Sequence, residues 1–263
     1  MNEDFSKYNG EGTVLRRAQM RMLEILIEVD KICQKHNIRY WLDYGTLLGA
    51  VRHGGFIPWD DDLDISMLRK DYDKLRTILP EELPKQFVFE DWKNNRDFNM
   101  KHAKVRDKNS YYEVPYWQNK NCLHGIFIDI FPKEKVISNR WRKKIDFFYG
   151  RAFRRIRGFN ESRKELYLSY LMWIPCICLA SICQFFSNIF SKDSLAHPYG
   201  GITLYHKCKN STIFPLKEIL FEGRFFPVPC DAHLYLTWQY GDYMQIPPEE
   251  KRATHATKIE IYN

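Results

Sequence analysis

The sequence predicts a mixed α/β fold, and two kinds of periodicity support this prediction. Residues 62–67 alternate strictly between polar and apolar side chains, which is typical of a half-buried strand. Residues 124–132 form a largely apolar run of strand length, whereas residues 13–36 repeat apolar positions at helical spacing. At 263 residues, 44% of them hydrophobic, the chain is long enough for one substantial core, or for one core with an insertion.

The other elements of the first half follow from local signals. An apolar run at 38–43 predicts a first strand, and a short helix is expected at 46–52. An amphipathic helix is predicted over 71–79, ended by the proline that follows it. Residues 87–90 and 98–106 predict further strands.

Four carboxylates gather within five positions at the start of the predicted strand: Asp60, Asp61, Asp62 and Asp64. At close range each pair repels by about 1 kcal/mol even in water. A folded protein keeps such a cluster when a cation or a set of positive partners neutralises it. The alternation puts Asp62 and Asp64 on one face of a strand, which suits a hard divalent cation that also takes phosphate oxygens.

A solvated acidic turn and a calcium-binding loop are the alternatives. Asp60, Asp62 and Asp64 match the first three ligand positions of a calcium loop. The position that requires glycine is Ile65, however, and the last ligand position is Asp71 in place of glutamate. The calcium loop therefore fails at two of its fixed positions.

The residues before the cluster argue against a plain turn. Gly45 and Thr46 follow the first strand, so Thr46 can cap the short helix, whose exposed N–H groups favour an anion. Arg52 and His53 stand beside two glycines that would let the backbone approach a ligand closely. Either side chain could contact phosphate, although a histidine in a loop is more often simply solvated.

Two later strands carry charges that could complete the site. Lys104 and Arg106 lie two positions apart in the strand at 98–106, and fixed cations near a diphosphate stabilise a leaving group. Ordinary surface charge is the alternative. Asp129 is the single acidic residue in the apolar strand at 124–132, where a carboxylate is costly unless it is paired or metal-bound. A buried structural salt bridge is the alternative there.

Composition narrows the partners. A net charge of +7 suits nucleotide phosphates, acidic lipid surfaces or nucleic acid, but no ordered basic-aromatic motif is visible, so no nucleic-acid partner is expected. Seven cysteines form no Cys-x-x-Cys pair, which disfavours zinc ligation and a disulfide framework and favours a reducing cytoplasm. The acidic, polar N-terminus predicts no secretory signal.

The stretch from Asp43 to Ile65 resembles the signature of the LicD family, which includes bacterial phosphocholine transferases and the fukutin-related proteins. That family is similar to polymerase-beta-like nucleotidyltransferases, in which a Gly-Ser/Thr turn and an Asp-x-Asp pair are joined by a third carboxylate on a later strand. The resemblance is dense over 38–75 and thin between 135 and 210. It recurs in shorter patches near 98–112, 123–132 and 218–255, the last of which includes Glu222, Asp242 and His255.

This resemblance implies one nucleotidyltransferase-like catalytic domain over 1–263, with a basic and apolar helical insertion at about 140–200. It implies transfer of a phospho-alcohol group, most typically phosphocholine from CDP-choline, to a hydroxyl of a cell-surface glycan or lipid-linked saccharide. Asp62, Asp64 and Asp129 would hold Mg²⁺, or Mn²⁺ in its place, and Asp129 would also accept the acceptor's proton. The residues expected to bind substrate are Gly45, Thr46, Arg52, His53, Lys104, Arg106, Asp60 and Asp61.

Other interpretations of the function stay open. The donor could be CDP-ribitol or CDP-glycerol, or the reaction could be nucleotidyl transfer. A non-catalytic module that binds anionic lipid or nucleic acid through its charge is the alternative outside enzymes.

The segment from 140 to 191 differs from the rest of the chain. Residues 140–164 include ten Lys and Arg, and 166–191 carry no charge over a length that reaches the roughly 20 residues of a membrane span. A span would put the two flanks, which both resemble the family, on opposite sides. We therefore expect a buried or interfacial helical hairpin, with the basic helix meeting anionic lipid at the inner face of the cell membrane. A core helix pair and a span are the alternatives.

Overall fold

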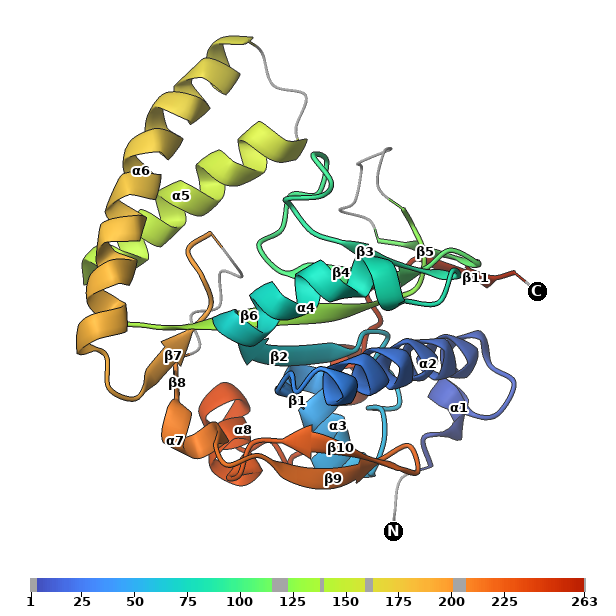
Figure 1. Cartoon of the computed structure of the whole chain (residues 1–263). Coiled ribbons are helices and arrows are strands. Elements are labelled where there is room, and N and C mark those ends of the chain that lie inside the picture. Colours follow the sequence, from blue (N-terminus) through green and yellow to red (C-terminus); the bar gives the residue numbers. More distant parts are fainter. Residues whose placement is uncertain (1–3, 115–122, 138–139, 159–162, 201–206, 263) are drawn as a thin grey trace.

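A computed structural model describes residues 4–114, 123–137, 140–158, 163–200 and 207–262 (Figure 1). The central sheet has the strand order β1-β2-β6-β4-β3. In that order the strands are Tyr40–Leu42, Asp64–Leu68, Phe127–Lys135, Ala103–Asp107 and Phe87–Glu90. β2 and β6 are parallel, and the other neighbours along this path are antiparallel. With its helices, this sheet confirms the mixed α/β prediction.

The sheet has one polar face and one apolar face. Asp64, Asp129, Lys104 and Glu90 are register partners in turn across β2, β6, β4 and β3. Because side chains alternate along a strand, this row of four charges lies on one face. The opposite face is apolar and fully buried, with Ile65, Met67, Ile128, Ile130, Ala103 and Val105.

Two helices cover the apolar face: α2 (Val14–Lys35) and α4 (Arg69–Glu82) (Figure 1). α2 confirms the helix predicted at 13–36 and buries its apolar stripe in the main core. α4 continues two residues past Pro80, so the predicted end there is wrong. The proline removes one helical N–H donor near the end of α4, and the last turn still closes through the bond from Leu83 N to Leu79 O of 3.1 Å.

α3 (Tyr44–His53) begins two residues earlier than predicted, because Asp43 caps it. The Asp43 carboxylate accepts the Tyr44 N–H at 2.8 Å. Thr46 is therefore not the cap. Its hydroxyl instead accepts the N–H of Asp64 at 2.8 Å, which ties α3 to the start of β2. Since β2 begins at Asp64, Asp62 lies in the loop just before the strand and not inside it.

The C-terminal part wraps around the sheet. β9 (Lys217–Phe221) and β10 (Arg224–Val228) form a hairpin. α8 (Ala232–Tyr240) follows its cap Asp231, which accepts the Leu234 N–H at 2.9 Å. β11 (Lys258–Ile261) pairs with β5 (Ser110–Glu113), which brings the end of the chain beside the central sheet. The smaller elements are α1 (Ser6–Asn9), β7 (Ser194–Ala196), β8 (Cys208–Lys209), α7 (Asn210–Ile213) and a 3₁₀ turn (Glu249–Lys251).

α5 (Arg140–Gly158) and α6 (Arg163–Phe190) pack on each other as a helical hairpin beyond the end of β6 (Figure 1). After α6 the chain returns to the sheet that it left, because β7 pairs with β6 at Glu134 and Ala196. Most large side chains of α6 are exposed, so the core-pair alternative is wrong. Within the described residues, α6 is the helix with the length and apolar composition needed to cross a membrane.

Candidate active site

Asp64 and Asp129 meet on adjacent parallel strands. They are register partners, and their exposed fractions are 8% and 7%. The backbone around Asp64 is fixed from two sides, since its N–H donates to Thr46 and its carbonyl accepts the N–H of Asp43 at 3.0 Å. Two acidic strands far apart in the sequence therefore converge on the polar face of the sheet.

Asp60 and Asp62 add two more carboxylates to this acidic cluster of Asp60, Asp62, Asp64 and Asp129. Burial raises the pKa of Asp60, Asp62 and Asp64, and repulsion from neighbouring carboxylates raises it further. A methyl group added at Gly45 would lie 2.6 Å from Asp60 Oδ2, so the glycine permits this close approach. The donor set is made of hard carboxylate oxygens, the ligand type that suits Mg²⁺ or Mn²⁺, and a divalent cation would relieve their repulsion.

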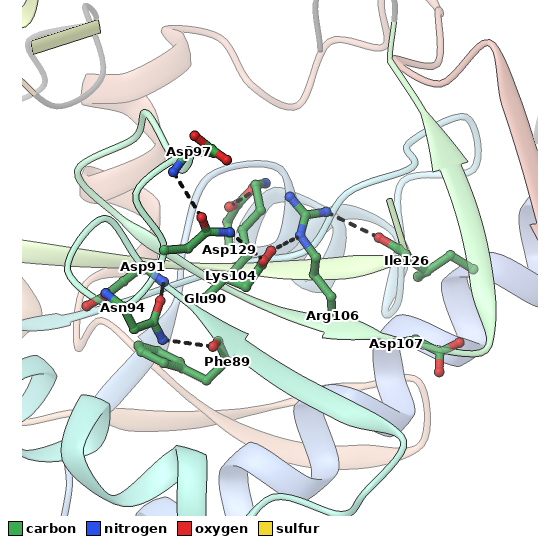
Figure 2. Close-up of polar contacts among 12 residues, drawn as sticks. Phe89, Glu90, Asp91, Asn94, Asp97, Lys104, Arg106, Asp107, Ile126 and Asp129 are labelled. Atoms are coloured by element: carbon green, nitrogen blue, oxygen red, sulfur yellow. Dashed lines mark hydrogen bonds and ion pairs between the residues drawn. The ribbon is translucent and has the colours of Figure 1, made fainter. Parts of the chain in front are cut away.

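Asp129 differs from the other three because the buried cation Lys104 and the ring of His102 already contact it. Lys104 Nζ lies 2.6 Å from its Oδ1 (Figure 2). His102 Nε2 lies 3.1 Å from the same oxygen. Burial favours the protonated form, but Lys104 and His102 outweigh it and lower the pKa of Asp129 to about 2. Asp129 is therefore a carboxylate whose charge is fixed by its partners.

Lys104 and Arg106 lie on one face of β4, as predicted, and both are buried, so the surface-charge alternative is wrong. Arg106 Nε donates to Glu90 Oε2 at 2.7 Å, and its Nη1 donates to the Gly125 carbonyl at 3.3 Å (Figure 2). Burial lowers the pKa of Lys104 to about 8. Two buried cations thus lie on the polar face of the sheet, where Lys104 contacts Asp129 and Arg106 contacts Glu90.

Asp61 anchors the C-terminal segment. Its oxygens accept the N–H groups of His255 at 2.9 Å and Ala256 at 2.7 Å, and the hydroxyl of Tyr112 at 2.9 Å. His255 Nδ1 also lies 3.0 Å from Asp61 Oδ1, and this bond raises the pKa of His255 to about 8. In the described ranges, ligand atoms of Asp60, Asp61 and His255 lie within 4.8 Å of one another, but the oxygens of Asp61 are already engaged by backbone donors.

Arg52 and His53 make their contacts with other parts of the chain. Arg52 Nη1 donates to the Tyr243 carbonyl at 2.8 Å, and its Nε donates to His53 Nε2 at 3.0 Å. The His53 ring packs edge-on against Phe5 and Trp59. Burial lowers the pKa of His53 to about 4, so this ring is neutral at physiological pH. These contacts hold the end of α3 in place.

A buried polar group beside the cluster was not predicted from the sequence. Lys133 Nζ lies 3.1 Å from Asp43 Oδ2, 3.1 Å from His197 Nε2 and 3.3 Å from Tyr44 Oη. The predicted strand ended at residue 132, whereas β6 runs on to Lys135. The alternation through Asp129 puts Lys133 on the polar face, and that alternation was the available signal.

Comparison with known proteins identifies the family of this chain. A family profile described as "LicD/FKTN/FKRP, nucleotidyltransferase domain" matches residues 37–160. The lipopolysaccharide cholinephosphotransferase LicD of Haemophilus influenzae is 30% identical over 263 aligned residues, which cover 92% of this chain and 95% of that protein. The ribitol 5-phosphate transferase FKRP of Homo sapiens is 48% identical over 120 residues, 44% of this chain and 22% of that protein. The mouse FKRP is 30% identical over 120 residues, with the same coverage. The resemblance seen in the sequence is thus confirmed, and the chain belongs to the LicD family.

Proposed function

We propose that this protein transfers a phospho-alcohol group from a CDP-linked donor to a hydroxyl of a cell-surface glycan or lipid-linked saccharide. The observation that carries the proposal is the row of Asp64, Asp129 and Lys104 across three strands, with Asp60 and Asp62 beside it. Phosphocholine from CDP-choline is the first choice, because the relative named as a cholinephosphotransferase aligns over 95% of its length. CDP-ribitol is the second, since the FKRP relatives are named as ribitol 5-phosphate transferases.

We propose that Asp62, Asp64 and Asp129 hold the cation in a nucleotidyltransferase-like core. Bound Mg²⁺ or Mn²⁺ supplies positive charge to the diphosphate of the donor and to the leaving CMP. Lys104 orients Asp129 and adds a second positive charge on the polar face. We assign Asp129 to cation binding and not to proton transfer, because a carboxylate that contacts Lys104 and His102 is a weak base.

Several residues expected to bind substrate have a positioning role in this proposal. Thr46 fixes the first residue of β2 through the Asp64 N–H, and Gly45 leaves room for the Asp60 carboxylate. Asp61 holds the C-terminal segment, and Arg52 holds the loop at Tyr243. They build the frame in which the cation-binding carboxylates stand, so a change at any of them alters the geometry of the cluster.

The donor is tested by thermal shift with CDP-choline, CDP-ribitol, CDP-glycerol, CTP and UTP, each with and without Mg²⁺. A true donor raises the melting temperature only when the metal is present, since a ligand stabilises the state that it binds. The product mass then separates phospho-alcohol transfer, which releases CMP, from nucleotidyl transfer, which leaves the nucleoside monophosphate on the acceptor. Metal-independent binding of every nucleotide would contradict the proposal.

We further propose that the protein is located at the cytoplasmic face of the cell membrane.

A further inference from the structure

α6 carries its small side chains inward and its large apolar side chains outward. The buried residues of this helix are Ser169, Cys176, Ala180 and Ser187. At about 100° per residue they form one stripe. The outer face of α6, defined by Leu168, Leu171, Ile174, Ile182, Phe185 and Ile189, lies on the opposite side, and each of its side chains is more than half exposed. A soluble helix has the reverse arrangement.

This apolar face is long and continuous. A helix of 28 residues is about 42 Å long. Its neighbour α5 adds the exposed rings of Phe147 and Phe148 to the same hairpin. Contiguous apolar surface on this scale marks an interaction site. The hairpin therefore has a partner, and its charge identifies the kind of partner.

The hairpin also carries the positive charge of the chain. Residues 140–190 hold ten Lys and Arg against three Asp and Glu, while the rest of the chain holds thirty of each kind. The whole net charge of +7 therefore lies in this segment. Its exposed basic side chains include Lys143, Lys144, Arg151, Arg154, Arg163 and Lys164. Such a charge attracts anionic lipid headgroups, whereas two copies of the hairpin would repel each other.

We propose that the α5–α6 hairpin docks on the surface of an anionic lipid bilayer, with the outer face of α6 embedded at the boundary between headgroups and acyl chains. An amphipathic pair with a basic helix and an apolar face is suited to lie in this plane. α6 does not cross the bilayer, because the basic α5 packs along it and cannot enter the hydrocarbon. Both ends of the hairpin also return to the same sheet.

Docking in this plane would keep the candidate active site at the lipid surface. Lys101 Nζ donates to the hydroxyl of Tyr149 in α5 at 3.0 Å. Lys101 directly precedes His102, which contacts Asp129. Arg142 of α5 donates to the His197 carbonyl at 2.7 Å. α5 is thus fixed to segments that line the polar face. That this brings a lipid-linked acceptor to the site rests on the proposed function, whereas the docking itself does not.

Flotation of the full-length chain with vesicles tests the docking independently of catalysis. Vesicles of phosphatidylcholine with phosphatidylglycerol are compared with phosphatidylcholine alone. We expect flotation with the anionic vesicles that weakens with salt. The variant Ile182→Ser/Phe185→Ser/Ile189→Ser should lose it, and Arg151→Glu/Arg154→Glu/Lys164→Glu should bind anionic vesicles about a hundredfold more weakly.

A matched control removes exposed apolar side chains elsewhere. Leu220→Ser/Phe225→Ser/Met244→Ser should float like the unchanged protein, because these side chains lie outside the hairpin. Each variant is first shown to be folded by its melting curve. Equal flotation of the α6 variant and the unchanged protein overturns the proposal. Resistance of the bound protein to extraction by alkaline carbonate would also overturn it, because that result indicates a membrane span. A dimer in solution that the α6 variant dissociates would overturn it too, because that result assigns the outer face of α6 to a second copy of the chain.

Discussion

Asp64 lies directly opposite Asp129 in the parallel ladder between β2 and β6. The two carboxylates are not equivalent, because Lys104 and His102 contact Asp129. Burial, followed by repulsion from neighbouring carboxylates that include Asp62 and Asp129, raises the pKa of Asp64. One member of the pair is compensated by the protein itself. The other member is repelled by its neighbours, so a divalent cation gains most at Asp64.

Neutralising these two residues should change stability in opposite directions. Without metal, Asp64→Asn should stabilise the fold by about 1 kcal/mol, since it removes repulsion. Asp129→Asn should destabilise it by about 3 kcal/mol, because it leaves Lys104 buried without its anion. Urea unfolding in EDTA measures both, and Mg²⁺ should stabilise the unchanged protein more than either variant. Equal losses in both variants would refute the assigned asymmetry.

Lys133→Met should be among the most damaging changes outside the acidic cluster. Lys133 is 1% exposed and faces the fully buried Asp43 at 3.1 Å, so its removal strands a carboxylate in the interior. We expect a loss of about 3–5 kcal/mol in the free energy of unfolding. In the double variant Lys133→Met/Asp43→Asn the loss should be smaller than the sum of the two single losses. Strict additivity would show that the two side chains do not act as a pair.

Glu222 should make the free energy of unfolding depend on pH in the acidic range. It binds Arg16 through both oxygens, at 2.9 and 2.6 Å, and also accepts the Phe56 N–H at 3.0 Å. Burial favours its protonated form, but these donors outweigh it and lower the pKa of Glu222 below its ordinary 4.5. Its contribution is therefore complete above pH 4.5 and is lost as pH falls through the folded pKa.

The check is to unfold the unchanged protein and Glu222→Gln across this range. Glu222→Gln should cost about 1–3 kcal/mol at neutral pH, and the difference between the two proteins should shrink below pH 4.5. A difference that grows on acidification would have the wrong sign for this ion pair. Lys7→Gln is a suitable control, because its pair with Glu249 lies exposed at the surface.

Asp61→Asn should loosen the C-terminal segment and not only the site. The Asp61 side chain is fully buried and accepts the N–H groups of His255 and Ala256. In the variant the NH₂ group of the asparagine would face one of these N–H donors, and a hydrogen bond would be lost. Hydrogen exchange should become faster over β11 while the protection of α2 changes little. Unchanged protection of β11 would show that Asp61 does not anchor this segment.

Elements whose periodicity is local could be predicted from the sequence. The helical repeat gave α2, and the alternation after Asp61 gave β2 and its polar face. Thr46 suits the cap of α3 by residue type. Its hydroxyl, however, accepts the N–H of Asp64, and Asp43 caps the helix instead. Which of two polar residues three positions apart caps a helix depends on tertiary partners that lie far along the chain.

The carboxylates of the candidate site and two of its cations, Lys104 and Arg106, could be predicted from the sequence, whereas His102 and Lys133 could not. Asp129 stands out as a charge within an apolar strand. His102 has no such local signal, and Lys133 lies beyond residue 132, where the predicted strand ended. Lys104 meets Asp129 because the two are register partners in β4 and β6. Lys133 reaches the polar face because β6 extends beyond Pro132. The pairing of β5 with β11 is likewise a long-range contact without a local turn. Such pairings are fixed by the packed fold and not by neighbouring residues.

The most direct test is the release of CMP from CDP-choline as Mg²⁺ is titrated into the unchanged protein and into Asp64→Asn. Release of CMP should saturate with Mg²⁺, stop in EDTA and fall about a hundredfold in Asp64→Asn, while the melting temperature of this variant in EDTA should not be lowered. If CDP-ribitol is the true donor, the same dependence appears with that nucleotide. Equal release of CMP by the two proteins, or release that is indifferent to Mg²⁺, would contradict the account.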